Sequence, residues 1–473
     1  MGTQGKTPGE PSGEAKAGWN PWLDWPAAAP WQQVSAAWVA LRTQALVMHA
    51  QRHSAFYRRH WGGWRSGDPW TTLLPVRKAE LMAHFDEWAT DPQVTLAGVR
   101  EFTADPSRIG DDYLGRYAVW TSSGTTGEPA IFVQDASALA VYATLTAWHQ
   151  DGRDLVSRLM QGGWWAGARS ALVAAVDRHY AGVTFWQRMG RIQPWVGAQS
   201  RLFSVIEPID QLCARLNDFQ PGFLASYPSM LGELATCQTQ GRLKLNLRAL
   251  WAGGERLTPA LRATAEAAFG VPVVNDYGAS ECMNIAFECP HGRLHVNDDW
   301  VLLEPIDRAG RPVPAGEASH SVLLTNLANQ VQPIIRYELR DSVMVHADAC
   351  PCGNPRSSIR VHGRSDDVLH FTDARHRAVR LSPMALTTVI EEHSPVRRFQ
   401  LRQTGADAVE LRLDLSQCAE PSAAGQQAVK ALRDYLALQG LGQVHVRLSR
   451  TPPEPDPRSG KLRQVVCCVA DAA

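Results

Sequence analysis

Seven of the nine residues from Thr121 to Pro129 are Ser, Thr or Gly, and this run separates two short apolar segments. A loop of this composition can point successive backbone N–H groups and hydroxyls at an anion, because glycine permits a close approach and each hydroxyl adds a donor. Phosphate is the expected guest. The Gly-x-x-x-x-Gly-Lys-Ser/Thr pattern of a P-loop is absent from this run. Taken alone, the run is also compatible with a polar turn that binds nothing.

Other stretches along the chain add to this interpretation: "LWAGGERL" (250–257), "NDYGASE" (275–281), "PIIRYELRDSV" (333–343), "GRSDDVL" (363–369) and "PRSGKLRQV" (457–465). In this order and at this spacing, the set resembles the adenylate-forming superfamily of acyl-CoA synthetases and their relatives. The phenylacetate–CoA ligase branch is the most similar, and the chain looks like an atypical member of it. The resemblance covers about residues 70–467.

The resemblance implies a reaction that joins a carboxylate to the α-phosphate of ATP and expels pyrophosphate. Such catalysis consists mainly of positioning and of neutralising crowded negative charge. The loop that would hold the β- and γ-phosphates consists of Thr121, Ser122, Ser123, Gly124, Thr125, Thr126 and Gly127. The family usually has a Lys where this chain has Glu128. An acid there repels phosphate unless it points outward.

By the same resemblance, the adenine slot would be lined by Gly253, Gly254 and Glu255, and the nucleotide site completed by Asp276, Tyr277, Gly278 and Ser280. Asp341 would accept hydrogen bonds from the ribose, and Arg364 would reach the ribose or a phosphate.

The catalytic group implied by the family comprises Lys461, Glu281 and Thr121. Lys461 would bridge the acyl carboxylate and the α-phosphate, a role that suits a compact charge on a long stem. Glu281 would bind Mg²⁺, which prefers carboxylate oxygen. Delivery of Lys461 requires a small C-terminal domain to pivot, with Asp367 as the expected hinge.

The acyl pocket is expected to have apolar and aromatic walls formed by Phe132, Tyr227, Trp251, Gly278 and Met283. Such walls suit an aryl or arylacetic acid, although core packing explains the same residues. His179 and Tyr180 are candidates for approaching this pocket too, with a structural role favoured for both.

The acceptor of the acyl group stays open. Residues 368–386 lack the Gly-containing stretch that forms the pantetheine tunnel in CoA ligases of this branch. CoA is the usual acceptor in the family, and an amine is the alternative. A third reading, a non-catalytic nucleotide-binding relative, is disfavoured because a pure binder needs neither Glu281 nor Lys461.

A second constellation combines "ECPHGRLH" (288–295) with "CPCG" (350–353). Cys289, His295, Cys350 and Cys352 form a Cys₃His set of the kind that structural Zn²⁺ prefers, with His291 as an alternative nitrogen ligand. Ordinary reduced cysteines are the competing explanation.

The elements that must position these residues follow from the hydrophobic pattern. Residues 31–95 are helical in pattern, and from 118 to 300 short β-rich runs alternate with helical ones, which favours mostly parallel strands. The predicted fold is α/β: a large adenylate-forming N-terminal domain with mixed and parallel sheets, plus a small α+β C-terminal lid domain. The expected units are a disordered leader (1–30), the AMP-binding domain (31–366, β-rich at 296–362) and the mobile C-terminal domain (367–473).

Composition limits the partners. The 473 residues contain 47 Lys+Arg and 47 Asp+Glu, so the zero net charge does not favour nucleic acid or an anionic membrane. No apolar run approaches the roughly 18 residues of a membrane span. Nine cysteines, an odd number, favour reduced thiols and a cytoplasmic location. A small-molecule acid and acceptor are the expected partners, and a homodimer is left open.

Overall fold

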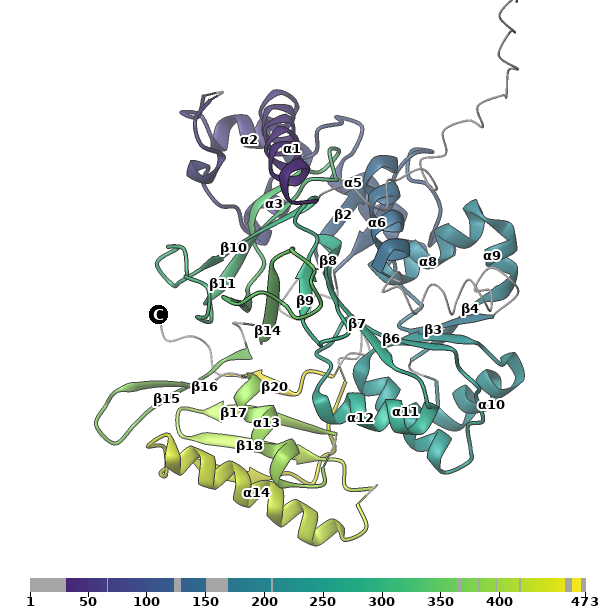
Figure 1. Cartoon of the computed structure of the whole chain (residues 1–473), viewed down its shortest axis with the longest axis vertical. Helices are drawn as coiled ribbons and strands as arrows, with labels where there is room; N and C mark the ends of the chain where they lie inside the picture. Colours follow the sequence, from purple (N-terminus) through teal and green to yellow (C-terminus); the bar gives the residue numbers. More distant parts are fainter. Residues whose placement is uncertain are drawn as a thin grey trace, which may run out of the picture.

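A nine-stranded sheet is the centre of the large N-terminal unit (Figure 1). The computed structural model describes residues 31–65, 67–122, 129–149, 169–205, 207–364, 367–381, 383–396, 398–416, 418–455 and 462–468. The strand order is β13-β14-β9-β8-β7-β6-β5-β3-β4. The half from β4 to β7 is parallel, and the half from β7 to β13 is antiparallel. Its strands are β3 (Ser170–Ala174), β4 (Ser200–Ser204), β5 (Phe223–Ser226), β6 (Ala249–Ala252), β7 (Val273–Ala279), β8 (Cys282–Glu288), β9 (Leu294–Val296), β13 (Asp341–Val345) and β14 (Ser358–Arg364).

Two smaller sheets complete the strands of this unit. They are the hairpin β1 (Ala118–Thr121) and β2 (Ile131–Gln134), and the antiparallel sheet β10 (Val301–Ile306), β11 (Ser321–Asn326) and β12 (Ile334–Glu338). The helices of the unit are α1 (Trp31–His53), α2 (Ala55–His60), α3 (Lys78–Ala83), α4 (Phe85–Trp88), α5 (Leu96–Ala104), α6 (Ala136–His149), α8 (Ala181–Ile192), α9 (Pro194–Gln199), α10 (Ile209–Phe219), α11 (Pro228–Thr239) and α12 (Pro259–Phe269), with 3₁₀ turns at Trp70–Thr72 and Pro106–Arg108.

The helices between the parallel strands start and stop at local signals. In α12, the Thr258 side chain accepts a hydrogen bond from the Leu261 N–H, Pro259 occupies the first turn, and Gly270 closes the helix at φ +70°. These N-cap and C-cap interactions set the two ends of the helix. Because α12 connects β6 to β7 as a crossover, the two strands run parallel and end at the same edge of the sheet.

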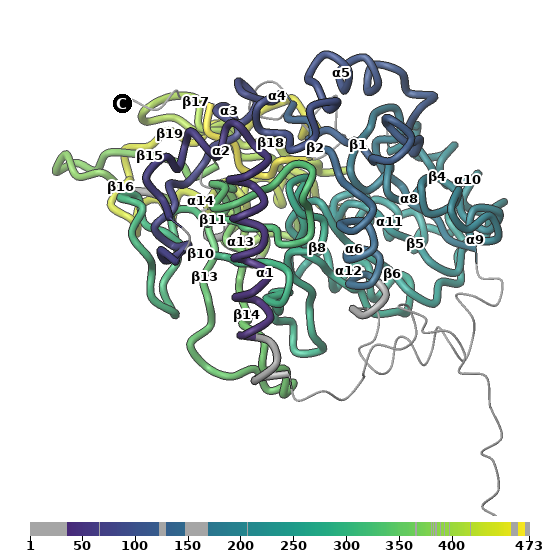
Figure 2. The backbone as a smooth tube through the Cα atoms, turned by 90° about the horizontal axis from the view of Figure 1, so that it is seen from above, coloured from purple at the N-terminus to yellow at the C-terminus, as the bar shows by residue number. Residues whose placement is uncertain are grey.

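The small C-terminal unit follows β14. It contains the hairpin β15 (Leu369–Thr372) and β16 (Ala378–Leu381), the helices α13 (Pro383–His393) and α14 (Pro421–Leu438), and the four-stranded sheet β19 (His445–Leu448), β18 (Ala408–Leu413), β17 (Phe399–Gly405) and β20 (Val465–Cys467). Among the described residues, its buried apolar cluster runs from Leu369 to Val465 and shares no member with the clusters of the large unit. In Figure 2 the β15–β16 hairpin and the α9–α10 region lie at opposite ends of the molecule.

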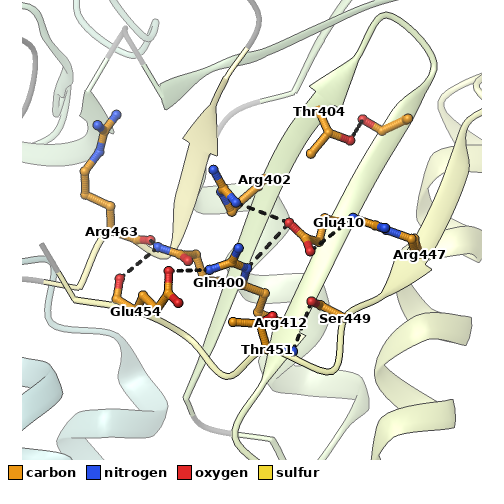
Figure 3. Close-up of polar contacts among 11 residues, drawn as sticks. Gln400, Arg402, Thr404, Glu410, Arg412, Arg447, Ser449, Thr451, Glu454 and Arg463 are labelled. Carbon is orange, nitrogen blue, oxygen red and sulfur yellow. Dashed lines mark hydrogen bonds and ion pairs between the residues drawn. The ribbon is translucent and has the colours of Figure 1, made fainter.

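One face of the C-terminal sheet is polar (Figure 3). Glu410 on β18 lies between arginines of the adjacent strands, 3.3 Å from Arg402 and 3.2 Å from Arg447. Burial raises the pKa of Glu410, but a hydrogen bond from Ser449 and the surrounding arginines outweigh it and lower the pKa. A carboxylate enclosed by guanidinium groups joins the neighbouring strands through charge-assisted hydrogen bonds.

The predicted α/β class and the division into a larger and a smaller unit are confirmed. Two runs expected to join the alternating region, 118–121 and 130–133, instead form the separate antiparallel hairpin β1–β2. The short connection between them cannot contain the helix that a parallel crossover needs. Among the described residues, the helices lack the combination of length and apolar character that crossing a bilayer requires.

Candidate active site

A cleft of about 2250 Å³ lies between the large unit and the C-terminal unit. Parallel strands leave such crevices at their carboxyl ends. Tyr227 and Gly253 directly follow β5 and β6, and Tyr277 lies in the second half of β7. Most of the predicted site residues line this cleft: Thr121, Ser122, Tyr227, Trp251, Gly253, Gly254, Glu255, Asp276, Tyr277, Gly278, Ser280, Glu281, Met283, Asp341, Arg364 and Asp367. Residues as far apart in the chain as Thr121 and Asp367 thus line one space. Near it, the Trp120 indole N–H donates to the Ser280 carbonyl at 2.7 Å.

The base of the predicted phosphate loop is closed by Ser122. Its N–H donates to the Ala130 carbonyl at 2.8 Å, and its hydroxyl accepts from the Ala130 N–H at 2.9 Å. Thr121, one residue earlier, is anchored by its N–H to the His179 carbonyl at 2.7 Å. Ser123, Gly124, Thr125, Thr126, Gly127 and Glu128 lie outside the described residues. The two ends of the loop are therefore fixed at the rim of the cleft.

Asp341 is the acceptor at the predicted ribose position. The Tyr277 hydroxyl donates to its Oδ2 at 2.6 Å, and Arg364 forms an ion pair with its Oδ1 at 3.6 Å. Burial and the Asp341 carboxylate hold the pKa of Tyr277 well above its usual range, so its hydroxyl remains a donor. Asp341 and Arg364 face each other because β13 and β14 pair them in register. This pairing holds the carboxylate in one orientation.

Glu281 has a fixed orientation. Its side chain is buried, and the Tyr337 hydroxyl donates to Oε1 at 2.7 Å. Asn326 donates to its backbone carbonyl at 3.0 Å. Burial and Glu281 raise the pKa of Tyr337, which keeps that hydroxyl protonated. A held carboxylate at the edge of the cleft fits Mg²⁺, because magnesium sites in nucleotide enzymes use one or two carboxylates together with phosphate oxygens.

Glycines surround the predicted adenine slot. A Cβ at Gly253 would lie 2.8 Å from Asp276 Oδ1, and one at Gly278 would lie 1.9 Å from the Met283 carbonyl oxygen. The Trp251 indole N–H donates to Asp276 at 2.9 Å. Burial raises the pKa of Asp276 to about 6 in spite of this hydrogen bond. At both positions the protein's own atoms occupy the space of a side chain, so glycine is required for the close packing of this wall of the cleft.

Glu255 connects three parts of the molecule. Its Oε2 accepts from the Ser229 N–H in the first turn of α11 at 3.0 Å, and its Oε1 accepts from the Leu462 N–H at 2.7 Å. Leu462 directly follows Lys461, which itself lies outside the described residues. At the hinge position, Asp367 is buried and forms an ion pair with Arg463. The end of the C-terminal unit is thus docked against the wall of the cleft.

The acyl side of the cleft contains more aromatic residues than expected. Trp251, Tyr227 and Met283 line it, and Trp186 and Phe223, which sequence reasoning missed, line it too. Their rings are 6.3 Å apart and stacked, and Phe223 contacts Trp251 edge-on. The aromatic-rich run "TFWQRM" (184–189), on α8, was the available signal.

Phe132 does not reach the cleft, and His291 does not join the cysteine cluster. Phe132 is 1% exposed and packs edge-on against Trp88, so the structure does not bring it to the cleft, because β2 faces the core. His179 is buried, with Nε2 2.9 Å from the Asp105 carbonyl, while Tyr180 lines the cleft. His291 is exposed, whereas Cys289, His295, Cys350 and Cys352 converge into one cluster.

Comparisons with known proteins agree with this geometry. The AMP-binding enzyme family model matches residues 115–319. A phenylacetate–coenzyme A ligase from Thermus thermophilus is 28% identical over 74% of this chain and 80% of its own length. A 2-hydroxyisobutyryl-CoA ligase, solved in the postadenylation state, superposes with a TM-score of 0.64 at 20% identity, over 93% of this chain and 90% of that one. The amide bond synthetase McbA from Marinactinospora thermotolerans superposes with a TM-score of 0.50 at 17% identity, over 71% of this chain and 66% of that one. Residues 115–319 therefore match the AMP-binding enzyme family, and the chain is similar over most of its length to AMP-forming phenylacetate–coenzyme A ligases of the adenylate-forming superfamily.

Proposed function

We propose that this protein activates an aryl or arylacetic acid with ATP as an acyl adenylate and passes the acyl group to CoA. The observation that carries the proposal is the hydrogen bond from Leu462 to Glu255. It attaches the residue after Lys461 to the cleft that contains the Asp341–Tyr277 pair and Glu281. The aromatic side of the cleft supports an aryl substrate.

In the first step, a carboxylate oxygen of the acid attacks the α-phosphorus of ATP. The bond from that phosphorus to the bridging oxygen breaks, and pyrophosphate leaves with the electron pair. Bound Mg²⁺ supplies charge neutralisation at the phosphate oxygens. Glu281 would hold that ion, Asp341 would fix the ribose, and Ser122 with the rest of the 121–127 loop would hold the terminal phosphates. Lys461 would neutralise charge between the acyl oxygen and the α-phosphate.

In the second step, the acceptor attacks the acyl carbon, the C–O bond to AMP breaks, and the acceptor loses a proton. We propose that the C-terminal domain, from 367 onward, pivots at Asp367 between the two steps. The pivot must break the hydrogen bond from Leu462 to Glu255, which joins the two units.

The Lys461→Ala variant tests the adenylation step. Wild type should catalyse ATP–pyrophosphate exchange that depends on an added aryl acid. Lys461→Ala should keep ATP binding and lose exchange by on the order of 100-fold, because one transition-state charge contact is removed. Lys430→Ala, an exposed lysine on α14 paired with Asp434 at 2.5 Å, is the matched control. Unchanged exchange in Lys461→Ala, or no acid-dependent exchange in wild type, would contradict the proposal.

The second candidate keeps adenylation and transfers the acyl group to an amine. The observation that favours it is the segment after the hinge, which lacks the Gly-containing stretch of the pantetheine tunnel. In its place β15 and β16 form a hairpin, and the Asp373 side chain accepts hydrogen bonds from the Arg375 and Arg377 N–H groups in its turn, both at 2.8 Å. AMP release measured with CoA and with a panel of amines separates the two acceptors. Release driven by CoA supports the first candidate, and release driven by an amine supports the second.

A further inference from the structure

Four metal-ligating side chains converge at one end of the nine-stranded sheet. One ligand atom from each of Cys289, His295, Cys350 and Cys352 lies within 4.8 Å of all the others. Cys289, His295 and Cys350 are buried, and Cys352 is partly buried. The cluster combines two distant segments: Cys289 in the turn after β8 with His295 on β9, and Cys350 with Cys352 in the connection between β13 and β14.

The distances fit a tetrahedral zinc site. Cys289 Sγ and Cys350 Sγ are 3.6 Å apart, and Cys352 Sγ is 3.3 Å from His295 Nε2. With Zn–S of about 2.3 Å and Zn–N of about 2.0 Å, a tetrahedron has S···S edges of about 3.8 Å and S···N edges of about 3.5 Å. A disulfide would place two sulfurs about 2.05 Å apart. The sulfurs are therefore spaced as ligands of a shared ion.

The surroundings orient the ligands. His295 Nδ1 lies 3.1 Å from the Arg356 carbonyl, an arrangement in which Nδ1–H donates and the Nε2 lone pair is left for the cluster. The Asn354 N–H points at Cys352 Sγ at 3.4 Å, and Gly353, at φ +76°, turns the chain back after Cys350. Support of this kind, beyond the ligands themselves, is expected at a built metal site.

The cluster lies at the opposite end of β14 from Asp341, the residue that we propose to bind the ribose. Ser358, at the start of β14, pairs with His295, whereas Arg364, at its end, pairs with Asp341. Six residue steps of strand, about 20 Å, lie between the two ends. The donor set contains three sulfurs and one nitrogen, which closes a tetrahedron without an open position.

We propose that Cys289, His295, Cys350 and Cys352 bind one structural Zn²⁺. The ion fastens the β8–β9 turn to the β13–β14 connection. It thereby reinforces the join of β9 to β14, where only Ser358↔His295 and Ile359↔Leu294 are paired. Since β14 ends at Arg364 and leads to Asp367, the zinc site fixes the strand from which the C-terminal unit departs.

The test is metal analysis of the full-length protein purified without added zinc. We expect about one zinc per chain in wild type and less than about 0.2 in Cys350→Ser, because a structural site requires its full ligand set. Cys237→Ser removes an equally buried thiol on α11 and should keep the metal. Wild type without zinc, both as purified and after dialysis against zinc, would overturn the proposal.

Two further measurements guard against misfolded variants. Wild type in which Co²⁺ replaces the zinc should show the intense visible absorption bands of a tetrahedral thiolate site. The weak bands of octahedral Co²⁺ would contradict the proposed ligand set. His295→Cys should retain one metal and shift those bands, because a fourth thiolate replaces the imidazole. Removal of zinc from wild type by a chelator should raise hydrogen exchange of the β14 amides, and unchanged exchange would contradict the fastening role.

Discussion

At Asp341 a tyrosine and an arginine converge on one carboxylate, and they orient the side chain that we propose to bind the ribose. The Tyr277 hydroxyl and the Arg364 guanidinium approach different oxygens of Asp341. Each partner limits rotation of the carboxylate, so that its remaining lone pairs point in fixed directions. A hydrogen bond to a charged group contributes about 1.5–3 kcal/mol.

Tyr277→Phe removes one of these partners and leaves the ring in place. We expect the KM for ATP in pyrophosphate exchange to rise about tenfold, the equivalent of about 1.4 kcal/mol, because Asp341 is less well oriented. Tyr117→Phe removes a comparable hydroxyl, 2.8 Å from Asp91 and away from the cleft, and should leave KM unchanged. Equal effects of the two variants would argue against the ribose role of Asp341.

Asp276 predicts a pH dependence of stability. Burial raises its pKa to about 6 in the folded protein, above the model-peptide value of about 3.9 expected in the unfolded chain. Between these pH values the folded state binds more protons than the unfolded chain. The free energy of unfolding is therefore highest below about pH 4 and falls as the pH rises to about 6. Asp276→Asn should therefore raise the free energy of unfolding at pH 7 by up to about 3 kcal/mol. In urea unfolding the gain should vanish near pH 4, and a gain equal at both pH values would contradict this origin.

At the scale of elements, the site depends on how closely β7 and β8 approach each other. Gly278 sits at the irregular step between the Tyr277↔Ala286 and Ala279↔Cys282 pairs. A side chain there would meet backbone, which cannot rotate away. The Tyr277 and Glu281 side chains, on either side of this step, depend on the same close approach.

Gly278→Ala is therefore expected to lower the free energy of unfolding by at least about 2 kcal/mol, since the new Cβ would overlap the Met283 carbonyl. Exchange activity should fall with it. Gly182→Ala on α8, where a Cβ meets nothing within 4 Å, should be neutral or stabilising by about 0.5–1 kcal/mol. Chemical unfolding of both variants checks this difference, and similar stabilities would disprove the clash.

At the scale of the whole molecule, a few polar contacts hold the C-terminal unit against the large one. Arg398 pairs with Glu233 on α11, Arg256 donates to Thr387 on α13 at 2.5 Å, and Leu462 donates to Glu255. Partly exposed ion pairs contribute only about 0–1 kcal/mol each. An interface of this kind can release without unfolding either unit, as a pivot requires.

Glu233→Gln should shift the population toward undocked C-terminal units without changing the thermal midpoint by more than about 1 °C. Distances between fluorophores attached to the two units would report the shift. ATP–pyrophosphate exchange should slow about two- to threefold, because the lost ion pair contributes less than about 1 kcal/mol to docking. Asp210→Asn breaks a comparable arginine pair, with Arg242, inside the large unit and should change neither. A docked fraction unaffected by Glu233→Gln would show that this pair does not hold the units together.

Short sequence patterns were sufficient for much of this description. Glycine and hydroxyl runs, helix caps and the Tyr-Gly-Ala-Ser-Glu stretch act over a few residues, so their chemistry is visible in the chain. The apolar pattern of the sequence predicts helices at 258–269 and 383–392, and the structure has them at Pro259–Phe269 and Pro383–His393. Strands β16, β17 and β20 were missed, because pairing with distant strands defines them.

Local residue types are enough to indicate the kind of chemistry and the order of the motifs. Which residues meet is visible only in the folded chain: Tyr337 at Glu281 across 56 positions, Leu462 at Glu255 across 207, and Phe132 in the core and not at the cleft. The folded chain also shows that His295, and not His291, lies with the three cysteines of the cluster. The physical reason is that such contacts depend on strand register and on the docking of two units, which the packing of the whole chain sets and no short window of sequence encodes.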